Sequence, residues 1–249
     1  MADQLSLSLE PSPIGWPATV QAMGAQPADE PFDDPDTLFE PWWGGERALA
    51  YTGRDPEAEA GSESLDLRVL SLDGEILTQL LPEIAELPER IGRRSAILDG
   101  TLVAVDAAGR LDDAGLAARL DGRPGPGLAF LVYDLLALDG RSVVGEPLER
   151  RRARLGRLLQ PTPSIVLVPM IAGEGRALCA AAAAQGVGWV LARDRRSPYL
   201  AGVTSSLWRL IAVKPDEAGP PPEPPSVPAS DANPILALIR RLPLDDPGP

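Results

Sequence analysis

Short apolar runs alternate with turn signals through the middle of the chain. The segment 65–71 alternates with period two, with Leu65, Leu67 and Val69 on one face, the pair Asp73-Gly74 is typical of a tight turn, and 75–79 returns. This pattern predicts a β-hairpin. The same reasoning predicts further strands over these ranges: 96–105, 128–138, 165–168, 187–193 and 207–213.

Helical spacing appears in three segments. Helices are expected over 82–91, over the Arg-rich stretch that has Pro147 in its first turn, and over the Ala-rich stretch from about 175 to 185. Strands outnumber helices, and hairpin turns connect them. The sequence therefore predicts an α+β fold with mainly antiparallel sheets flanked by helices, and not a doubly wound parallel sheet.

The two ends of the chain differ from its middle. Residues 1–36 are rich in Pro, Asp and Ser with weak periodicity, so we expect an extended acidic arm there and a folded domain over 37–214. Over 215–249, 11 of 35 residues are Pro, which interrupts both helices and strand ladders. This segment is expected to be a tail in which 234–242 is able to form a short amphipathic helix.

Composition excludes several kinds of chemistry. The chain has no His, which removes Ser-His-Asp and Cys-His mechanisms as well as the commonest neutral-nitrogen metal ligand. Its one cysteine, Cys179, lies among alanines and is expected to be a buried thiol on a helix. A lone cysteine fits a reducing compartment, and no apolar run reaches the roughly 20 residues of a membrane span. We therefore expect a cytoplasmic protein without a membrane partner.

The charge is strongly acidic. The net charge is −13, and the first 46 residues carry nine acids and no base. Phosphate binding draws on clustered Lys and Arg, so DNA is not expected to be a direct partner. The one dense basic stretch, 150–157, is interpreted as the solvated face of an amphipathic helix, with a nucleic-acid patch as the alternative.

Five strings occur in the order found in one enzyme family. The first, from Leu38 to Tyr51, is similar to F-E-P-K-W-D-G-x-R-A-L-A. The others are Ile97-Leu-Asp-Gly-Thr-Leu-Val-Ala, Val132-Tyr-Asp-Leu-Leu-Ala-Leu-Asp-Gly, Pro147-Leu-Glu-Arg-Arg, and Arg196-Ser-Pro-Tyr with Trp208. Over residues 38–214 the chain thus resembles the adenylation (nucleotidyltransferase) domain of ATP-dependent DNA ligases, especially the bacterial end-joining repair type.

The resemblance implies a mechanism in which a lysine amine attacks the α-phosphate of ATP, and the resulting lysyl-AMP is passed to a DNA 5′-phosphate. The position of that lysine is Trp42, which has no amine. Four further polar positions of the family also hold residues without the required group. The degenerate positions are Trp42, Gly44, Leu72, Thr101 and Gly188.

Some polar positions of the pattern survive. The resemblance assigns Tyr133 to stacking on adenine, and Arg47 and Arg193 remain as cations. Lys214, the only lysine, falls where the family keeps lysines that contact the triphosphate. These four residues are the candidate remnant of a nucleotide site. No cofactor is expected to be required, ATP and Mg²⁺ would be ligands only if nucleotide binding is retained, and no metal ligands are expected.

Three hypotheses follow. The first is a catalytically inactive ligase-like protein, without a C-terminal OB-fold, that binds a protein partner in a DNA repair setting inherited from the family. The second is an adenine-nucleotide sensor built on the remnant site. The third is an active ligase or nucleotidyltransferase that uses Lys214 or a different metal-dependent route.

Overall fold

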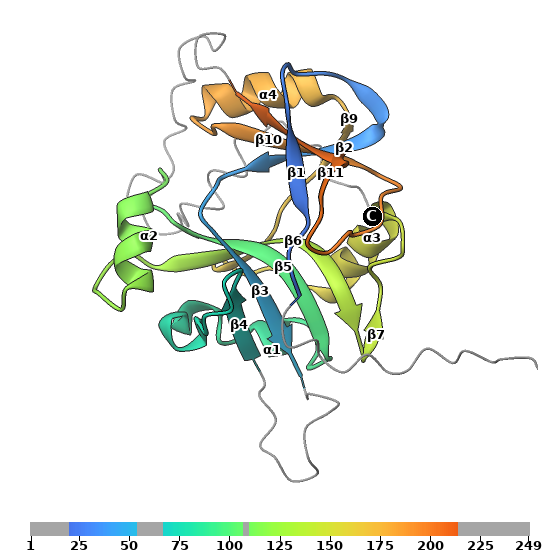
Figure 1. Ribbon diagram of the computed structural model, residues 1–249. Helices are drawn as coiled ribbons and strands as arrows, with labels where there is room; N and C mark the ends of the chain where they lie inside the picture. The colour runs from blue at the N-terminus through green and yellow to red at the C-terminus, as the bar shows by residue number, and fades with distance from the viewer. Residues whose placement is uncertain (1–19, 54–66, 107–109, 214–249) are drawn as a thin grey trace, which may run out of the picture.

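The computed structural model describes residues 20–53, 67–106 and 110–213. Two β-sheets lie one above the other (Figure 1). In order of pairing, the upper sheet contains β1 (Gly24–Ala28), β11 (Thr204–Ala212), β10 (Trp189–Asp194), β2 (Asp34–Trp42) and β9 (Ile171–Gly173). The lower sheet contains β4 (Leu67–Ser71), β3 (Glu46–Thr52), β5 (Ala96–Ala104), β6 (Leu128–Leu138) and β7 (Arg141–Ser142), with β8 (Ile165–Leu167) beside β6.

Most strand pairs in both sheets are antiparallel. Only β1 with β11 and β6 with β8 run parallel among the pairs of the described residues. Strand β6 is buried on both faces, which explains why its sequence is a continuous apolar run. The predicted α+β class with mainly antiparallel sheets is confirmed.

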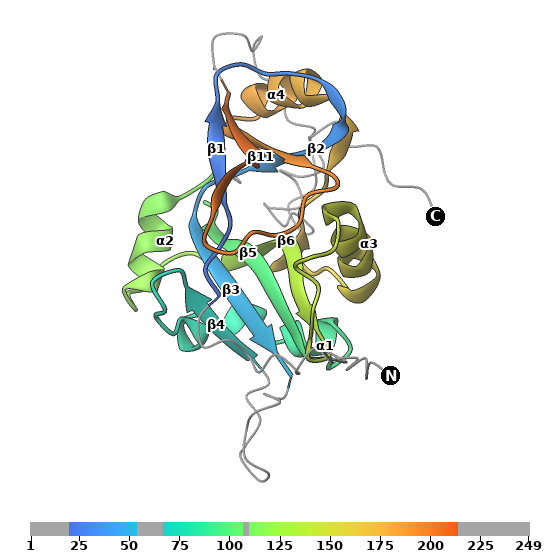
Figure 2. The same ribbon diagram turned by 45° about the vertical axis from the view of Figure 1, so that its right-hand side comes forward.

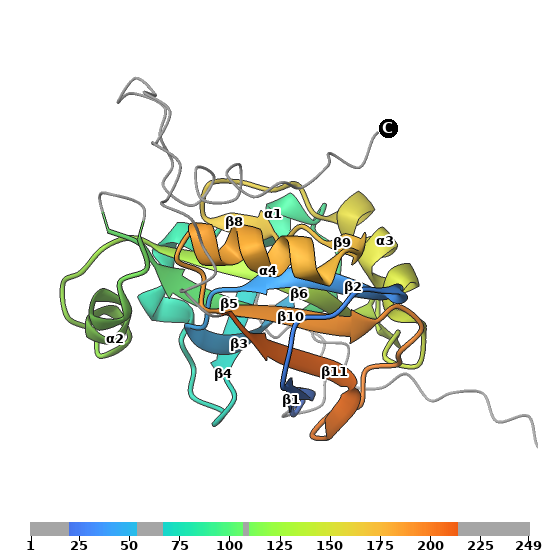
Figure 3. The same ribbon diagram turned by 90° about the horizontal axis from the view of Figure 1, so that it is seen from above.

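Helices cover the outer surfaces. Helix α4 (Gly175–Ala184) packs on β2 and β10 above the upper sheet (Figure 3), and α3 (Leu148–Leu158) packs beside β6 (Figure 2). Below the lower sheet lie two 3₁₀ turns and a short helix, and α2 contacts β5. Their bounds are η1 (Thr78–Leu80), η2 (Pro82–Ile84), α1 (Leu87–Arg90) and α2 (Asp113–Leu120). No helix in the described ranges is long and apolar enough to cross a membrane.

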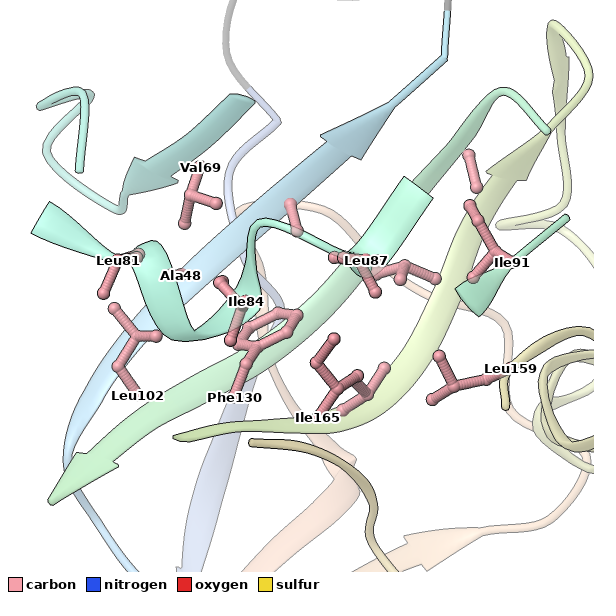
Figure 4. Packing of buried hydrophobic residues seen from close by; sticks show 14 of the residues in the cluster. Ala48, Val69, Leu81, Ile84, Leu87, Ile91, Leu102, Phe130, Leu159 and Ile165 are labelled. Atoms are coloured by element: carbon pink, nitrogen blue, oxygen red, sulfur yellow. The ribbon is translucent and has the colours of Figure 1, made fainter. Parts of the chain in front are cut away.

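The largest apolar cluster lies under the lower sheet, where the turns and α1 pack against its strands (Figure 4). A second cluster joins α4 to the upper sheet and extends to β6 and β8. A third, which includes Met23, Tyr199 and Trp208, lies between the sheets. Apolar burial therefore extends from the lower layer to α4, and the candidate site lies within this continuous interior.

Most predicted strands are present, but two local predictions were wrong. Residues 75–79 do not form a return strand: a single bridge joins Leu70 to Ile76, and η1 follows. The Thr78 hydroxyl accepts the Val69 N–H at 2.9 Å and so replaces a ladder bond. The helix expected over 82–91 is split into η2 and α1, because Pro88 lacks an N–H and its ring excludes a continuous helix through this point.

The predicted start of the folded domain at residue 37 was also wrong. Strand β1 pairs with β11, and β2 begins at Asp34, so part of the expected 1–36 arm belongs to the upper sheet. Met23 is fully buried, and its N–H donates to the Tyr199 hydroxyl at 3.0 Å. Local periodicity does not reveal such a contact because the two residues lie 176 positions apart. Residues 1–19, Lys214 and the expected 215–249 tail with its 234–242 helix lie outside the described residues.

Candidate functional site

The chain passes from the upper to the lower sheet through a short turn after Trp42, and several degenerate positions gather there. Gly44 and Gly45 have positive φ values of 71° and 82°. A Cβ at Gly45 would lie 2.2 Å from the Leu102 carbonyl oxygen, so this crossing requires glycine for both conformation and space.

Two of the degenerate positions contact each other at this crossing. The hydroxyl of Thr101, fully buried on β5, donates to the Gly44 carbonyl at 2.8 Å. The resemblance puts a glutamate at position 101, where it implies a ribose or metal contact, and an aspartate at position 44. Here the only side-chain oxygen of the pair is used to hold the backbone of the crossing.

Trp42 lies against Tyr133. The ring centroids of the two residues are 5.0 Å apart with an interplanar angle of 38°. Tyr133 is buried, and Trp42 is partly buried at the edge of the cluster beneath α4. The indole therefore occupies space beside the tyrosine ring that the resemblance assigns to adenine. The neighbouring Trp43 is 4 % exposed and is an ordinary core aromatic.

Arg193 is fully buried and joins the two sheets. From β10 its Nη2 donates to Glu40 Oε2 at 2.9 Å and to the Tyr133 carbonyl at 3.1 Å. Its Nη1 donates to Asp134 Oδ2 at 3.2 Å, and its guanidinium carbon lies 4.9 Å from the Trp208 ring centroid. Arg193 was predicted to be a cation that could contact phosphates. In the structure it is paired with carboxylates on β2 and β6.

Two arginines of the basic stretch enter the same interior. Arg151 makes a bidentate pair with Asp134, with distances of 2.9 and 2.8 Å. Arg152 donates to the Tyr133 carbonyl at 2.7 Å and to the Val168 carbonyl. Their exposed fractions are 0 and 6 %. The interpretation of 150–157 as a solvated face was wrong for these two residues, since they supply buried charge to the network.

The buried charges perturb one another. Burial raises the pKa of Glu40, against the opposing charges of Arg193 and Arg152. Burial also lowers the pKa of Arg152 to about 10, and burial with the charge of Glu40 raises the pKa of Tyr133 well above its ordinary value. Ionised groups are costly in such an environment unless they are paired. Arg193 is paired with Glu40 and Asp134, whereas Arg152 is held by backbone carbonyls.

Arg47, the second candidate cation, is paired as well. Its Nε and Nη2 donate to the two Asp99 oxygens at 3.0 and 2.6 Å, and its Nη1 donates to the Met23 carbonyl at 2.7 Å. The Tyr199 hydroxyl donates to Asp99 Oδ2 at 2.8 Å. This cluster attaches the segment before β1 to the lower sheet, and the Arg47 side chain keeps 18 % exposure.

The other candidate positions lie at the rim. Leu72 follows β4 in a turn and is 47 % exposed. Gly188 precedes β10, a Cβ there would meet no atom within 4 Å, and its carbonyl accepts the Val213 N–H at 2.9 Å. Lys214 comes directly after Val213 in the chain and lies outside the described residues.

These geometries test whether the site fits ATP and Mg²⁺ in the family's manner. Tyr133 is in contact with Trp42, and Arg193 and Arg47 are bound to carboxylates. In the described part of the chain no three His, Cys, Asp or Glu side chains gather into a possible metal site. Among the described residues, the ring and the two cations that the resemblance assigns to the nucleotide are thus engaged by other side chains, and no catalytic step is derived through them.

Sequence reasoning missed the partners that hold this interior together. Glu40 belongs to the first motif string, but nothing in the sequence pairs it with Arg193, which lies 153 residues away. Arg151 and Arg152 were hidden within a run that is typical of a surface helix. Their burial could have been inferred from their positions in the helix, because both arginines lie on the same helical face as Leu148 and Leu155.

The comparisons with known proteins agree with this architecture. The ATP dependent DNA ligase domain matches residues 32–210, which is most of the chain. This chain belongs to the ATP-dependent DNA ligase domain family. The LigD ligase domain of Mycobacterium tuberculosis shares its fold, with a TM-score of 0.62 at 24 % identity, over 77 % of this chain and 60 % of that one. A mycobacterial DNA ligase D complexed with ATP and MES aligns with a TM-score of 0.64 at 24 % identity, over 78 % of this chain and 60 % of that one.

Sequence relatives belong to the same family. The multifunctional non-homologous end joining DNA repair protein LigD of Mycobacterium tuberculosis is 29 % identical over 175 residues, covering 68 % of this chain and 21 % of the relative. A probable DNA ligase of Kineococcus radiotolerans is 31 % identical over 156 residues, covering 60 % of this chain and 30 % of the relative. The chain thus spans less than a third of the length of either relative and corresponds to their ligase-type domain.

Proposed function

We propose that this protein is a catalytically inactive member of the ATP-dependent DNA ligase family that acts as a protein-interaction module in DNA repair. The packing of Trp42 on Tyr133 carries the proposal. It puts an indole where the family chemistry needs a nucleophilic amine, and it covers the ring that would receive the base. Removal of the nucleophile ends the covalent route, whatever the remaining groups contribute.

A second line of support is the contrast between retained structure and lost chemistry. The fold, the Asp99-Gly100 and Asp134 positions, and the Ser197-to-Tyr199 string are kept, and these residues hold the interior together through buried bonds. The resemblance assigns the lost groups to one nucleotide site, where loss of one such group costs about 10²-fold to 10³-fold in rate in a functioning enzyme. A domain maintained in this way is expected to serve as a surface for a partner.

The repair setting rests on the relative that is named as a multifunctional non-homologous end joining DNA repair protein. A protein partner is favoured over direct DNA contact by the net charge of −13. The partner would then connect this domain to a repair assembly.

The proposal is tested by a self-adenylation assay with ATP labelled in the α-phosphate, combined with isothermal titration of ATP and Mg²⁺. We expect no covalent label and no binding heat into the millimolar range. Trp42→Lys is the matched variant, since it restores the amine alone. It is expected to remain unlabelled because Gly44, Thr101 and Gly188 still lack carboxylates. Labelling of the natural protein, or sealing of a nicked duplex by it, would refute the proposal.

The same titration separates the alternative functions. A nucleotide sensor would give a saturable isotherm that Tyr133→Ala abolishes, without covalent label. An enzyme that depends on Lys214 would give label that Lys214→Ala abolishes. The engagement of Tyr133 by Trp42 and of Arg193 by Glu40 favours the interaction module over both.

A further inference from the structure

An open hollow lies where three elements of the lower layer meet. The turn after α1, the end of β6 and the last turns of α3 surround a space of about 620 Å³. Backbone hydrogen bonds hold these elements together: the Gln160 N–H donates to the Arg90 carbonyl at 2.8 Å, and the Asp139 N–H donates to the Ser95 carbonyl at 2.7 Å. The hollow is thus formed by the folded layer itself, and it shares no residue with the degenerate nucleotide positions.

The inner lining of this hollow is apolar. Ile91 is fully buried in the largest apolar cluster (Figure 4), and Leu138 and Leu158 are partly buried against that cluster. Apolar surface at the base of a concave site favours a ligand that covers it with an apolar group of its own. The hollow therefore suits a side chain such as Leu or Phe better than a small hydrated ion.

Three arginines form the outer lining, and we refer to Arg94, Arg154 and Arg157 as the arginine rim. Arg154 and Arg157 are three residues apart on α3, so they lie on one face of the helix. The Arg94 and Arg154 side chains are 47 and 43 % exposed, and Arg157 is exposed as well. The rim therefore presents its guanidinium groups to solvent around an apolar base.

The arginine rim keeps capacity for an anion. Arg94 pairs with Asp139, and Arg154 pairs with Glu146 at 3.0 Å, both at the surface. Exposed pairs of this kind contribute little to stability, so these two arginines are able to turn toward a ligand at small cost. Within the described ranges, Arg157 forms no ion pair with a carboxylate. It is the cation of the rim that a ligand would meet without a competitor.

The combination of an apolar base and a cationic rim favours one class of anion. A peptide segment offers carboxylates and apolar side chains within a few residues, and so matches both parts of the hollow. A phosphate backbone offers charge alone, and Asp139 and Glu146 leave few rim cations to neutralise a row of phosphates. At 0.15 M salt the Debye length is about 8 Å, so acids of this chain farther away hardly affect a ligand bound in the hollow.

We propose that this hollow binds an acidic segment of a protein partner, with an apolar side chain of that segment in the hollow and its Asp or Glu carboxylates on the arginine rim. A guanidinium matches a carboxylate through two parallel N–H donors, which makes arginine well suited to such a contact. The inference rests on the proposed interaction function, because it names the surface and the chemistry of the partner. Binding at this place needs neither a nucleotide nor the residues around Trp42.

The experiment uses the full chain and fluorescein-labelled decapeptides that combine Asp or Glu with Leu or Phe at varied spacing. Fluorescence anisotropy at 0.15 M salt measures the affinity of each peptide. We expect saturable binding that weakens when the Leu or Phe becomes Ser, and also when the acids become Asn or Gln. Absence of saturable binding by every peptide up to about 1 mM, a free energy near 4 kcal/mol, would overturn the proposal.

Arg157→Glu is the test variant and Arg123→Glu is its matched control. Each reverses one exposed arginine and changes the net charge equally, but Arg123 follows α2, on the other side of the molecule from α3 (Figure 1). We expect peptide affinity to fall about tenfold or more in Arg157→Glu and to stay within about twofold in the control. Circular dichroism verifies that both variants fold. Equal losses in the two variants would reveal a general charge effect and overturn the site.

Oligonucleotides provide the competing outcome. Labelled single-stranded and duplex DNA are titrated in parallel under the same conditions. Tighter binding of DNA than of any peptide, lost in Arg157→Glu, would assign the rim to nucleic acid and overturn the peptide proposal. Because the assay contains no ATP, its failure leaves the self-adenylation result unchanged, and covalent labelling in that other assay would refute the inactive-ligase proposal without changing the peptide affinities.

Discussion

Arg193 shows how one residue alters the interior of this ligase-type domain. The resemblance puts a lysine at this position, and a lysine ammonium is a compact point charge. The planar guanidinium instead presents several N–H groups, and it reaches Glu40, Asp134 and the Tyr133 carbonyl together. A group that would face phosphates in an enzyme has become a structural link between two sheets.

Removal of this link is expected to be costly. Arg193→Ala leaves the Glu40 carboxylate buried without its partner, so the free energy of unfolding should fall by about 3–5 kcal/mol. Arg195→Ala is the control, because its pair with Glu149 is 35 and 44 % exposed and should contribute less than about 1 kcal/mol. Urea unfolding followed by circular dichroism measures both. Equal losses in the two variants would contradict the structural role of Arg193.

Glu40 is expected to make stability depend on pH with a definite sign. Burial raises its pKa above 4.5, so the folded state holds the proton more tightly than the unfolded state. Its contribution is therefore fully present below about pH 4.5 and is lost as pH rises through the folded pKa. The free energy of unfolding of the natural protein, relative to Glu40→Gln, should fall as pH rises above 4.5. Urea titrations over this range measure it.

Glu83 provides a control of opposite sign. Burial opposes its ionisation, but hydrogen bonds from Arg119 outweigh this and lower its pKa. Its contribution is present above pH 4.5 and lost as pH falls through the folded pKa. The natural protein should therefore lose stability relative to Glu83→Gln on acidification below pH 4.5. If the free energy of unfolding changed with pH in the same direction for Glu40 and Glu83, the raised pKa of Glu40 would be contradicted.

At the scale of elements, β5 and β6 form the centre of the lower sheet, and their close approach depends on Gly100. A Cβ there would lie 2.5 Å from both the Leu131 carbonyl oxygen and the Phe130 ring. The Asp99-Gly100 pair of the second motif string is thus explained by packing: Asp99 binds Arg47, and Gly100 admits β6.

Gly100→Ala is expected to destabilise the protein by about 1–3 kcal/mol or more, because backbone and an aromatic ring must shift to accept the methyl group. Gly188→Ala is the matched control, since nothing lies within 4 Å of its added Cβ, and a change within about 0.5 kcal/mol is expected. Thermal unfolding of the two variants decides the comparison. A neutral Gly100→Ala would mean that the two strands can separate slightly without loss.

For helix α3, the sequence predicted the helix itself but not the burial of its arginines. Its existence was predicted from the spacing of leucines and is confirmed, but Pro147, which was expected in the first turn, is the N-cap residue before Leu148. The sequence did not predict that Arg151 and Arg152 point into the interior, because charged side chains are almost never buried unless they are paired. The pairing groups lie on β6 and in the strand ends around it, which helical periodicity does not show.

For the whole molecule, charge is distributed unevenly. The segment from Asp29 to Glu40 carries six acids and no base, and it forms most of β2 and the chain before it in the upper sheet. The opposite sign gathers in 150–157, but Arg151 and Arg152 of that stretch are buried. Fewer basic groups therefore reach the surface than the sequence suggests, which reduces the charge available to a phosphate backbone.

Binding of a nicked duplex is accordingly expected to be weaker than about 10⁻⁴ M at 0.15 M salt, the weak end of non-specific association. Fluorescence anisotropy with a labelled duplex, repeated from 0.05 to 0.2 M salt, measures the affinity and its salt dependence. Saturable binding in the micromolar range, with a salt slope equal to several phosphates, would contradict this expectation and would revive the alternative of a nucleic-acid patch on α3.

The sequence by itself determined the family, the α+β class, most strand positions and the loss of the lysine at Trp42. These follow from local periodicity and short strings, which are properties of neighbouring residues. The tertiary structure alone decided that Trp42 packs on Tyr133, that Arg193 joins two carboxylates, and that Met23 belongs to the core. Each depends on contacts between residues far apart in the chain, and burial then fixes which charges are paired.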